Sequence, residues 1–312
     1  MSTSSWRARL AAIAGAAAVF DEPLASKVAF RIGGPADAYV KVSSAAMLSE
    51  ILRLAEAEAL PITVLGGGTN VLVADEGLRG IVLRLSGELA GADFEVAERG
   101  PSRAVIGAGA LNAAVVAQAL DLGLTGIEFL ATIPGTFGGA LIMNAGAHGG
   151  EIAPFVARVE LLDAGRQVAW RAAAECGFAY RHSGFGPKEL LTRAEIVLPR
   201  GDVAAARQHL AEMRAARKRT QPIGEPNAGS IFKNPPGDYA GRLIEAAGLK
   251  GRRVGGARVS ELHANFIVND GTARASEVVE LGRQVAAEVS ARFGVALEWE
   301  VKRLGDFGRL ER

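Results

Sequence analysis

The chain lacks the residues that disulfide-rich and zinc-binding proteins depend on. Cys176 is the only cysteine among 312 residues, which excludes an internal disulfide. The four histidines are scattered, and none lies at zinc-ligand spacing from a cysteine. We therefore expect no metal site. A reducing compartment, the cytoplasm, is the expected location.

An excess of one charge is also missing. The chain has 35 basic and 34 acidic residues, a net charge of +1. Without a basic surplus we expect neither nucleic acid nor a membrane surface as a partner. The sequence does not give the oligomeric state, and we favour a monomer.

No hydrophobic run is long enough to cross a bilayer. The apolar stretch Leu10–Phe20 has 11 residues and is mostly alanine. Because Arg7 and Arg9 precede it, a secretory leader is an alternative interpretation. We favour a small amphipathic or docking helix that stops at Asp21-Glu22-Pro23.

Glycine, by contrast, is abundant, with 39 residues where about 7% would be typical. The glycines cluster beside short β-branched runs. Glycine at the end of a strand indicates a turn with positive φ or a close approach of the backbone to another group. Several such loops in one half of the chain suggest a nucleotide cofactor lying along the backbone. The runs are Ile62–Leu65, Gly80–Leu85 and Ala104–Ile106.

Helical patterns alternate with these strands, and the sequence pattern changes near residues 199–202, where we place the main domain boundary. We expect an N-terminal lead-in over residues 1–26 and a domain over 27–200, made of subdomains 27–86 and 87–200. A third part covers 201–312. The expected helices are Ala45–Ala59, Asn112–Leu122, Val203–Arg219, Tyr239–Ala247 and Ala275–Phe293, and the expected late strands are His263–Val268 and Ala296–Leu304.

Neither glycine cluster fits a Rossmann fingerprint, because Gly66–Val71 and Gly107–Asn112 both lack the third glycine. No segment matches a P-loop. Successive amides of Gly66–Asn70 could instead form an anion-binding nest, although alone such a segment is more often a tight turn. Ile133–Gly150 is rich in small residues, which let the backbone approach either another backbone or a flat ligand.

Together these segments resemble the FAD-binding segments of the UDP-N-acetylenolpyruvoylglucosamine reductase family. The resemblance implies an α+β protein with a vanillyl-alcohol-oxidase-type FAD-binding domain of two subdomains. A C-terminal α+β substrate-binding domain would follow. Phe30–Asp37 matches the family's opening strand. By resemblance, non-covalent FAD would be bound by Gly66, Gly67, Gly68, Thr69, Asn70, Ile133, Pro134, Gly135, Thr136, Gly138, Gly139, Asn144, Ala145 and Gly146.

Three further segments carry the resemblance to the end of the chain, over roughly Ala29 to Gly305. They are Tyr180–Phe185, Asn227–Pro235 and Leu297–Gly305. The implied reaction is the NADPH-dependent reduction of UDP-N-acetylglucosamine enolpyruvate to UDP-N-acetylmuramate in peptidoglycan precursor synthesis. The interval between Ser183 and Ser230 is short, which resembles the family form without an extra tyrosine-bearing loop.

The resemblance assigns three catalytic residues. Arg181 would stabilise the negative charge that develops on the substrate carboxylate. Ser230 would donate a proton opposite the flavin. Glu300 would be the second electrophilic group, a role that requires a protonated carboxyl and therefore a burial that raises its pKa. Each residue alone has an ordinary structural interpretation, and the choice of Glu300 over Glu298 rests on the family spacing.

Substrate binding is assigned to cationic and polar groups near these motifs. The basic end of Val203–Arg219 could hold the UDP diphosphate, or it could be cations at a helix C-terminus. His263–Phe266 also matches the family, and we interpret it as a structural strand. The proposed substrate-binding residues are Tyr180, Arg214, Lys218, Lys233 and Asn234.

Two other functions remain as alternatives. A vanillyl-alcohol-type oxidase would act on an alcohol with oxygen and without NADPH. A catalytically inactive nucleotide-sugar sensor would bind substrate without turnover, and its sequence should have lost Arg181, Ser230 or Glu300.

Overall fold

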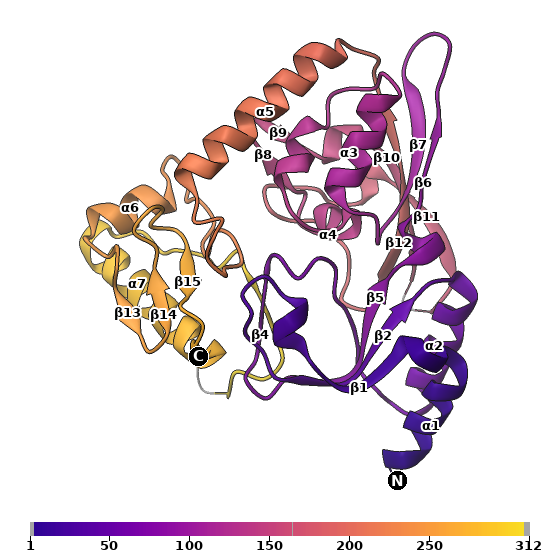
Figure 1. The fold of residues 1–312 in the computed structure, drawn as a ribbon, viewed down its shortest axis with the longest axis horizontal. Helices are drawn as coiled ribbons and strands as arrows, with labels where there is room; N and C mark the ends of the chain where they lie inside the picture. The colour runs from indigo at the N-terminus through magenta and orange to yellow at the C-terminus, as the bar shows by residue number, and fades with distance from the viewer. Residues whose placement is uncertain (1–2, 164, 309–312) are drawn as a thin grey trace. The chain divides into compact units, whose positions relative to one another are not determined.

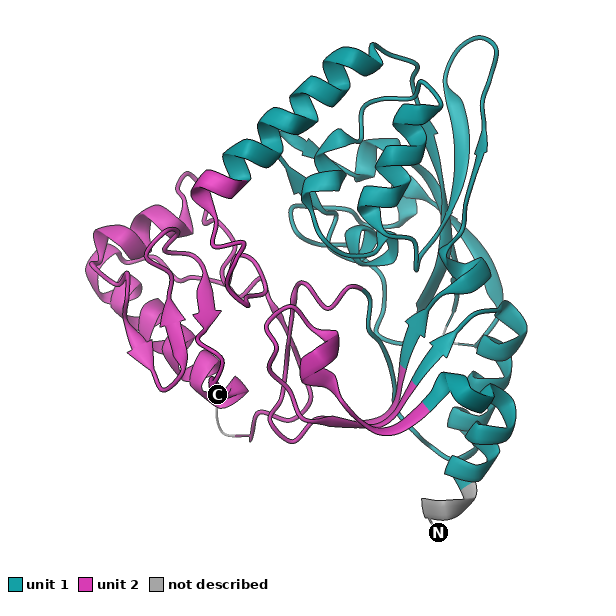
Figure 2. Ribbon diagram, viewed as in Figure 1, with its two compact units in different colours: residues 1–18, 40–66, 83–217 teal, residues 19–39, 67–82, 218–312 magenta. Residues whose placement is uncertain are grey.

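The computed structural model describes residues 3–163 and 165–308. The chain forms two compact units, shown in different colours in Figure 2. Each unit is assembled from three separate stretches of the chain. Unit 1 comprises residues 1–18, 40–66 and 83–217, and unit 2 comprises residues 19–39, 67–82 and 218–312.

Unit 1 contains a five-stranded antiparallel sheet in the order β11-β10-β12-β7-β6 (Figure 1). Helix α4 packs against β7 and β12. The short hairpin β8–β9 follows α4 in the chain. The bounds are β6 (Ala92–Glu95), β7 (Ser102–Gly107), α3 (Asn112–Asp121), α4 (Phe137–Ile142), β8 (Gly146–Ala147), β9 (Gly150–Glu151), β10 (Val156–Leu162), β11 (Val168–Ala172), β12 (Leu190–Leu198) and α5 (Val203–Thr220).

The N-terminal segment differs from the prediction. Helix α1 (Thr3–Ala14) packs against α2 (Ala45–Ala57) and ends before Gly15, whose φ is +53°. Residues Ala18–Pro23 form strand β1, with alternately half-buried and exposed residues. The predicted helix Leu10–Phe20 is therefore wrong in its second half, because a glycine in the left-handed conformation ends the helix and a period-2 pattern follows.

Strand β1 belongs to a four-stranded sheet of order β1-β2-β5-β3, in which β2 and β5 contribute residues to both units. The strands are β2 (Pro35–Val42), β3 (Ile62–Val64) and β5 (Leu78–Leu85). The predicted opening strand Phe30–Asp37 begins only at Pro35. Arg31 and Gly33, with φ of 56° and 140°, do not have the extended backbone of a strand.

Unit 2 is built on the long helix α7 (Ala275–Phe293), which ends as predicted at Gly294 with φ of +68°. Its buried stripe includes Val278, Leu281 and Val285. Burying each such side chain stabilises the fold by about 1.5–3 kcal/mol. The other elements are β4 (Val71–Val73), α6 (Ala240–Ala246), β13 (Arg253–Val254), β14 (Ala257–Val259), β15 (Ile267–Asn269) and β16 (Lys302–Leu304).

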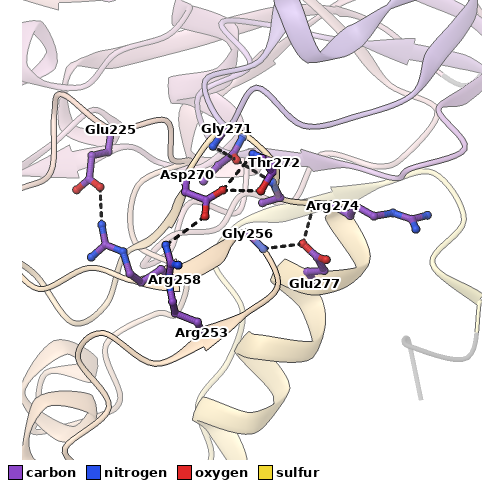
Figure 3. A network of polar contacts seen from close by, with 11 residues as sticks. Glu225, Arg253, Gly256, Arg258, Asp270, Gly271, Thr272, Arg274 and Glu277 are labelled. Atoms are coloured by element: carbon purple, nitrogen blue, oxygen red, sulfur yellow. Dashed lines mark hydrogen bonds and ion pairs between the residues drawn. The ribbon is translucent and has the colours of Figure 1, made fainter.

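Polar contacts hold the hairpin β13–β14 to the start of α7 (Figure 3). The Asp270 carboxylate accepts hydrogen bonds from the Thr272 hydroxyl at 2.7 Å and from Arg253 at 3.1 Å. Glu277 accepts from the amides of Gly256 and Arg274 at 3.1 and 3.0 Å. Glu277 thereby satisfies the amide of Arg274, the N-cap residue of α7, which has no partner within the helix.

Two predicted strands are shorter than expected. Of His263–Val268 only the end lies in β15, because a turn with a Phe266 N–His263 O hydrogen bond of 3.0 Å precedes it. Of Ala296–Leu304 only Lys302–Leu304 is a strand, pairing in parallel with β4. The residues before Lys302 make separate hydrogen bonds and one isolated β-bridge, which do not form a continuous strand.

Within the two described ranges, no helix combines the length and apolar character needed to cross a membrane. The same residues contain no group of three or more His, Cys, Asp or Glu side chains that could hold a metal ion.

Candidate active site

Gly66 and Thr136, which come from two glycine-rich segments, lie close together in unit 1. A Cβ atom on Gly66 would lie 2.5 Å from Thr136 Oγ1, so glycine is required for this approach. Asn112, the first residue of α3, holds the loop around Thr136 in place. Asn112 donates from its backbone N to Gly135 O at 3.1 Å and from Nδ2 to Ile133 O at 3.0 Å. Part of the glycine enrichment therefore serves contacts between protein segments.

The chemistry of these loops suits an anionic group. Leu65–Asn70 and Ile133–Ala140 contain no acidic residue, and their polar groups are backbone amides, threonine hydroxyls and the Asn70 amide. Amides and hydroxyls are donors that bind a pyrophosphate. Pro134 on the loop and Gly139 in α4 are exposed, whereas Thr136 is buried. Each segment, taken by itself, therefore has the donor groups that the pyrophosphate of FAD requires.

Gly68 has a separate structural requirement in unit 2. Its φ is +65°, and a Cβ atom there would lie 2.8 Å from Val28 Cα. The Gly68 carbonyl accepts a hydrogen bond of 2.8 Å from Ala29 N. This position must be glycine because of its own conformation and packing.

Arg181 lies in a tight turn of unit 1. Ala179 and His182 exchange two backbone hydrogen bonds of 3.1 and 3.0 Å, so Tyr180 and Arg181 form the tip. Arg181 has a φ of 51°, a left-handed conformation that is uncommon for a residue with a side chain. Strained backbone of this kind persists where the surroundings fix it, and it clusters at functional sites.

The Arg181 guanidinium contacts the β8–β9 hairpin, donating from Nη2 to Gly146 O at 2.8 Å. The Asn144 side chain connects the turn of Arg181 to the segment after β9. Its Nδ2 donates to Ala179 O at 3.1 Å, and its Oδ1 accepts from Ala153 N at 3.1 Å. The structure thus brings together three predicted site residues, Arg181, Asn144 and Gly146. The buried Asn144 side chain acts as a structural link.

Ser230 and Glu300 lie on hydrogen-bonded segments of unit 2. We call Ser230–Lys233 the serine strip. Ile231 O accepts from Glu300 N at 2.8 Å, and Lys233 N donates to Glu298 O at 2.8 Å. Two residues predicted to act on one substrate, 70 positions apart in sequence, are therefore adjacent in the fold.

Asn70, from a third part of the chain, contacts the segment that contains Glu300. Its Nδ2 lies 3.4 Å from Glu300 O, and its carbonyl accepts from Lys302 N at 3.0 Å. Glu298, by contrast, is mostly exposed and forms an ion pair with Lys233 at 3.2 Å. Arg181 belongs to unit 1, whereas Ser230 and Glu300 belong to unit 2.

Some of the predicted substrate-binding residues already make contacts within the protein, whereas others are exposed. Asn234 Oδ1 accepts from Ala240 N, the first residue of α6, at 3.1 Å. Tyr180 is half exposed, and its ring lies 5.2 Å from the Arg181 guanidinium carbon. On α5, Arg214 and Lys218 are exposed. Between them, Arg217 donates to Thr132 O, and burial lowers its pKa.

Asn265 is a residue whose importance the sequence did not reveal. Its side-chain amide forms hydrogen bonds with both the backbone N–H and the backbone C=O of Phe232. The backbone carbonyl of Asn265 accepts a hydrogen bond of 2.9 Å from Ile231 N. The only signal in the sequence was the family match of His263–Phe266, which we interpreted as a strand. The contacts show a turn that braces the serine strip.

Comparison with known proteins places this geometry in a family. Residues 221–304 match the model of the UDP-N-acetylenolpyruvoylglucosamine reductase C-terminal domain, and residues 36–170 match an FAD binding domain. A UDP-N-acetylenolpyruvoylglucosamine reductase of Anaeromyxobacter sp. is 45% identical over 304 residues, covering 97% of this chain and 94% of the relative. The chain belongs to the UDP-N-acetylenolpyruvoylglucosamine reductase family.

Further matches agree. UDP-N-acetylenolpyruvoylglucosamine reductase 2 of Symbiobacterium thermophilum is 50% identical over 289 residues, covering 91% of each chain. The crystal structure of the Thermus caldophilus enzyme has a TM-score of 0.78 at 38% identity, covering 92% of this chain and 98% of that one. A vanillyl-alcohol-oxidase-type flavoprotein of Myceliophthora thermophila has a TM-score of 0.50 at 14% identity, covering 96% of this chain and 63% of that one, which supports the fold alone.

These findings confirm the predicted family and fold class. The chain is an FAD-dependent oxidoreductase with a vanillyl-alcohol-oxidase-type FAD-binding domain. The individual roles of Arg181, Ser230 and Glu300 remain predictions.

Proposed function

We propose that this chain catalyses the NADPH-dependent reduction of UDP-N-acetylglucosamine enolpyruvate to UDP-N-acetylmuramate, with non-covalent FAD, in peptidoglycan precursor synthesis. The observation that carries the proposal is the hydrogen-bonded arrangement of Asn70, Ser230–Ile231 and Glu300. Family membership supplies the substrate class. The arrangement supplies a hydroxyl and a carboxyl group on neighbouring segments.

FAD, when bound, supplies hydride transfer from NADPH to the terminal methylene carbon of the enolpyruvyl group. Negative charge then develops on the substrate carboxylate, and we assign its stabilisation to Arg181. A guanidinium stays protonated, and its flat fork of donors fits a carboxylate. The turn and the bond to Gly146 O support this role, because they restrict the guanidinium before substrate arrives.

Ser230 is assigned the proton that must reach the neighbouring carbon. A serine hydroxyl is a weak acid, but the enediolate form of the substrate is a strong base, so transfer is feasible when the hydroxyl is correctly placed. We assign Glu300, in its protonated form, a hydrogen bond that assists this step. Its contact through Ile231 O supports a coupled role with Ser230.

The binding roles are proposed by position. The anion-compatible loops would hold FAD through Gly66–Asn70, Ile133–Thr136, Gly138–Gly139 and Asn144–Gly146. Tyr180, Arg214, Lys218, Lys233 and Asn234 would contact substrate. Asn234 would use Nδ2, since its Oδ1 accepts from Ala240 N.

We further propose that residues 27–200 form the FAD-binding domain, residues 201–312 form the substrate-binding domain and residues 1–26 form a lead-in. A cytoplasmic location and a monomeric state complete the proposal. NADPH and the enolpyruvyl substrate would use the same flavin face in turn, because hydride donor and acceptor must both reach the same flavin atom.

The test is the visible spectrum of the purified protein under anaerobic conditions. We expect a flavin spectrum that NADPH bleaches and that UDP-N-acetylglucosamine enolpyruvate then restores. Bleaching without recovery would exclude this substrate. Recovery by oxygen together with turnover of an alcohol, without NADPH, would indicate the oxidase alternative.

A further inference from the structure

On one side, the serine strip is held by Asn265 and its neighbour Phe266, and Asn265 makes the side-chain contacts. Its Oδ1 accepts from Phe232 N at 3.0 Å, and its Nδ2 donates to Phe232 O at 2.8 Å. The backbone carbonyl of Asn265 accepts a hydrogen bond of 2.9 Å from Ile231 N. The next residue, Phe266, forms an isolated antiparallel bridge with Ser230.

This side chain replaces a peptide group. In a regular sheet, the N–H and C=O of Phe232 would pair with a neighbouring strand. Here the carboxamide of Asn265 supplies both partners, since it has one acceptor and a donor in the same plane. Asn265, Ile231 and Phe232 are all buried, so water cannot replace these bonds if they are lost.

The other side of the strip leads directly to Glu300, which donates from its backbone N to Ile231 O. Asn265 itself is fixed by a hydrogen bond of 3.2 Å from its backbone N to His263 Nδ1. A chain of short contacts therefore runs from the turn through Asn265 and the strip to Glu300.

We propose that Asn265 is a positioning residue, which fixes the serine strip so that the Ser230 hydroxyl and Glu300 keep the geometry needed for proton delivery. This inference rests on the proposed function of Ser230 and Glu300. Asn265 acts through the backbone of Ile231 and Phe232. The substitution Asn265→Asp keeps the acceptor for Phe232 N and replaces the donor to Phe232 O with an oxygen, which repels that carbonyl.

Asn269 provides a matched control in the same unit. Asn269 is as buried as Asn265, and its side chain also binds backbone groups. Its Nδ2 donates to Phe30 O at 2.9 Å, and its Oδ1 accepts from Gly271 N at 2.7 Å. Asn269→Asp makes the same chemical change at a site where the side chain does not bond the serine strip. Both variants should lower the melting temperature to a similar extent.

The experiment measures two half-reactions by anaerobic stopped flow and the hydrogen–deuterium exchange of residues 230–233. In Asn265→Asp we expect flavin reoxidation by UDP-N-acetylglucosamine enolpyruvate to slow at least about tenfold, because small misplacements of reacting groups are costly. Flavin reduction by NADPH should stay within about twofold, because the serine strip takes no part in it. Exchange of the strip amides should accelerate in Asn265→Asp and stay unchanged in Asn269→Asp.

The outcomes separate the inference from the proposed function. If the unmodified protein is bleached by NADPH but not restored by substrate, the proposed function fails. If the unmodified protein turns over and Asn265→Asp reoxidises at the same rate, or if Asn269→Asp slows reoxidation equally, the positioning role is wrong. Should Asn265→Asp not fold, Asn265→Ser, which retains one hydroxyl partner without a charge, is measured by the same criteria.

Discussion

The two units hold their candidate catalytic groups in different ways. Arg181, in unit 1, is placed by a four-residue turn with a left-handed backbone and donates a hydrogen bond to Gly146 O. Ser230 and Glu300, in unit 2, are placed by hydrogen bonds among segments around residues 70, 231, 265 and 300. One arrangement is mostly local in sequence, and the other is entirely long-range.

The two arrangements differ in how precisely each must place its catalytic group. A guanidinium has several donors and its charge acts over several ångströms, so it tolerates a small displacement better than a group that transfers a proton. A hydroxyl that transfers a proton must lie within hydrogen-bond reach of its target. We therefore expect changes in unit 2 to affect proton delivery more sharply than changes in unit 1 affect charge stabilisation.

Ser230→Ala should have the largest effect. Removing the proposed proton donor should slow flavin reoxidation by substrate roughly 10³-fold, within the range for general acid catalysis. Flavin reduction by NADPH should survive, because that step does not involve the hydroxyl. Rapid-mixing absorbance measurements resolve the two half-reactions.

Ser290→Ala is the control for this change. Ser290 lies exposed near the end of α7 in the same unit, so its removal should leave both half-reactions unchanged. Unchanged reoxidation in Ser230→Ala would refute the assignment of Ser230 as the donor.

Arg181→Lys should have a smaller effect. Lysine retains the charge and loses the forked donor geometry, so kcat should fall roughly 10²-fold, comparable to losing one preorganised donor. Arg166 is the matched control, because it is another arginine of unit 1 with a left-handed φ, 61°, in a turn. Steady-state kinetics of Arg166→Lys should match those of the unmodified chain, and an equal loss in both variants would point to general destabilisation.

The same contrast explains what the sequence could predict. The bounds of α7 were correct because its apolar stripe and Gly294 are local signals. The strands His263–Val268 and Ala296–Leu304 were overextended because strand pairing depends on partners elsewhere in the chain. Glycine clustering predicted close approach, but the sequence could not identify Thr136 as the neighbour of Gly66. The role of Asn265 was hidden because all three of its bonds to the strip are tertiary.

His263 should give the smallest effect, a pH dependence of stability. Burial lowers its pKa from the usual 6.5, with Lys250 lowering it further and Glu245 opposing. The backbone N of Asn265 donates to His263 Nδ1, which requires that nitrogen to be unprotonated. The folded state therefore favours the neutral imidazole.

Because the folded pKa lies below the unfolded value, the unfolded chain binds more protons as pH falls through about 6.5. Folding stability should thus decrease on the acid side, and His263→Gln should lose that part of the decrease. Urea unfolding at about pH 7.5 and about pH 5.5 measures it. His209→Gln, which changes an exposed imidazole on α5, should keep the acid-side loss of the unmodified chain. If His263→Gln keeps the full loss, the acid sensitivity has another source, and protonation does not weaken the turn that braces the serine strip.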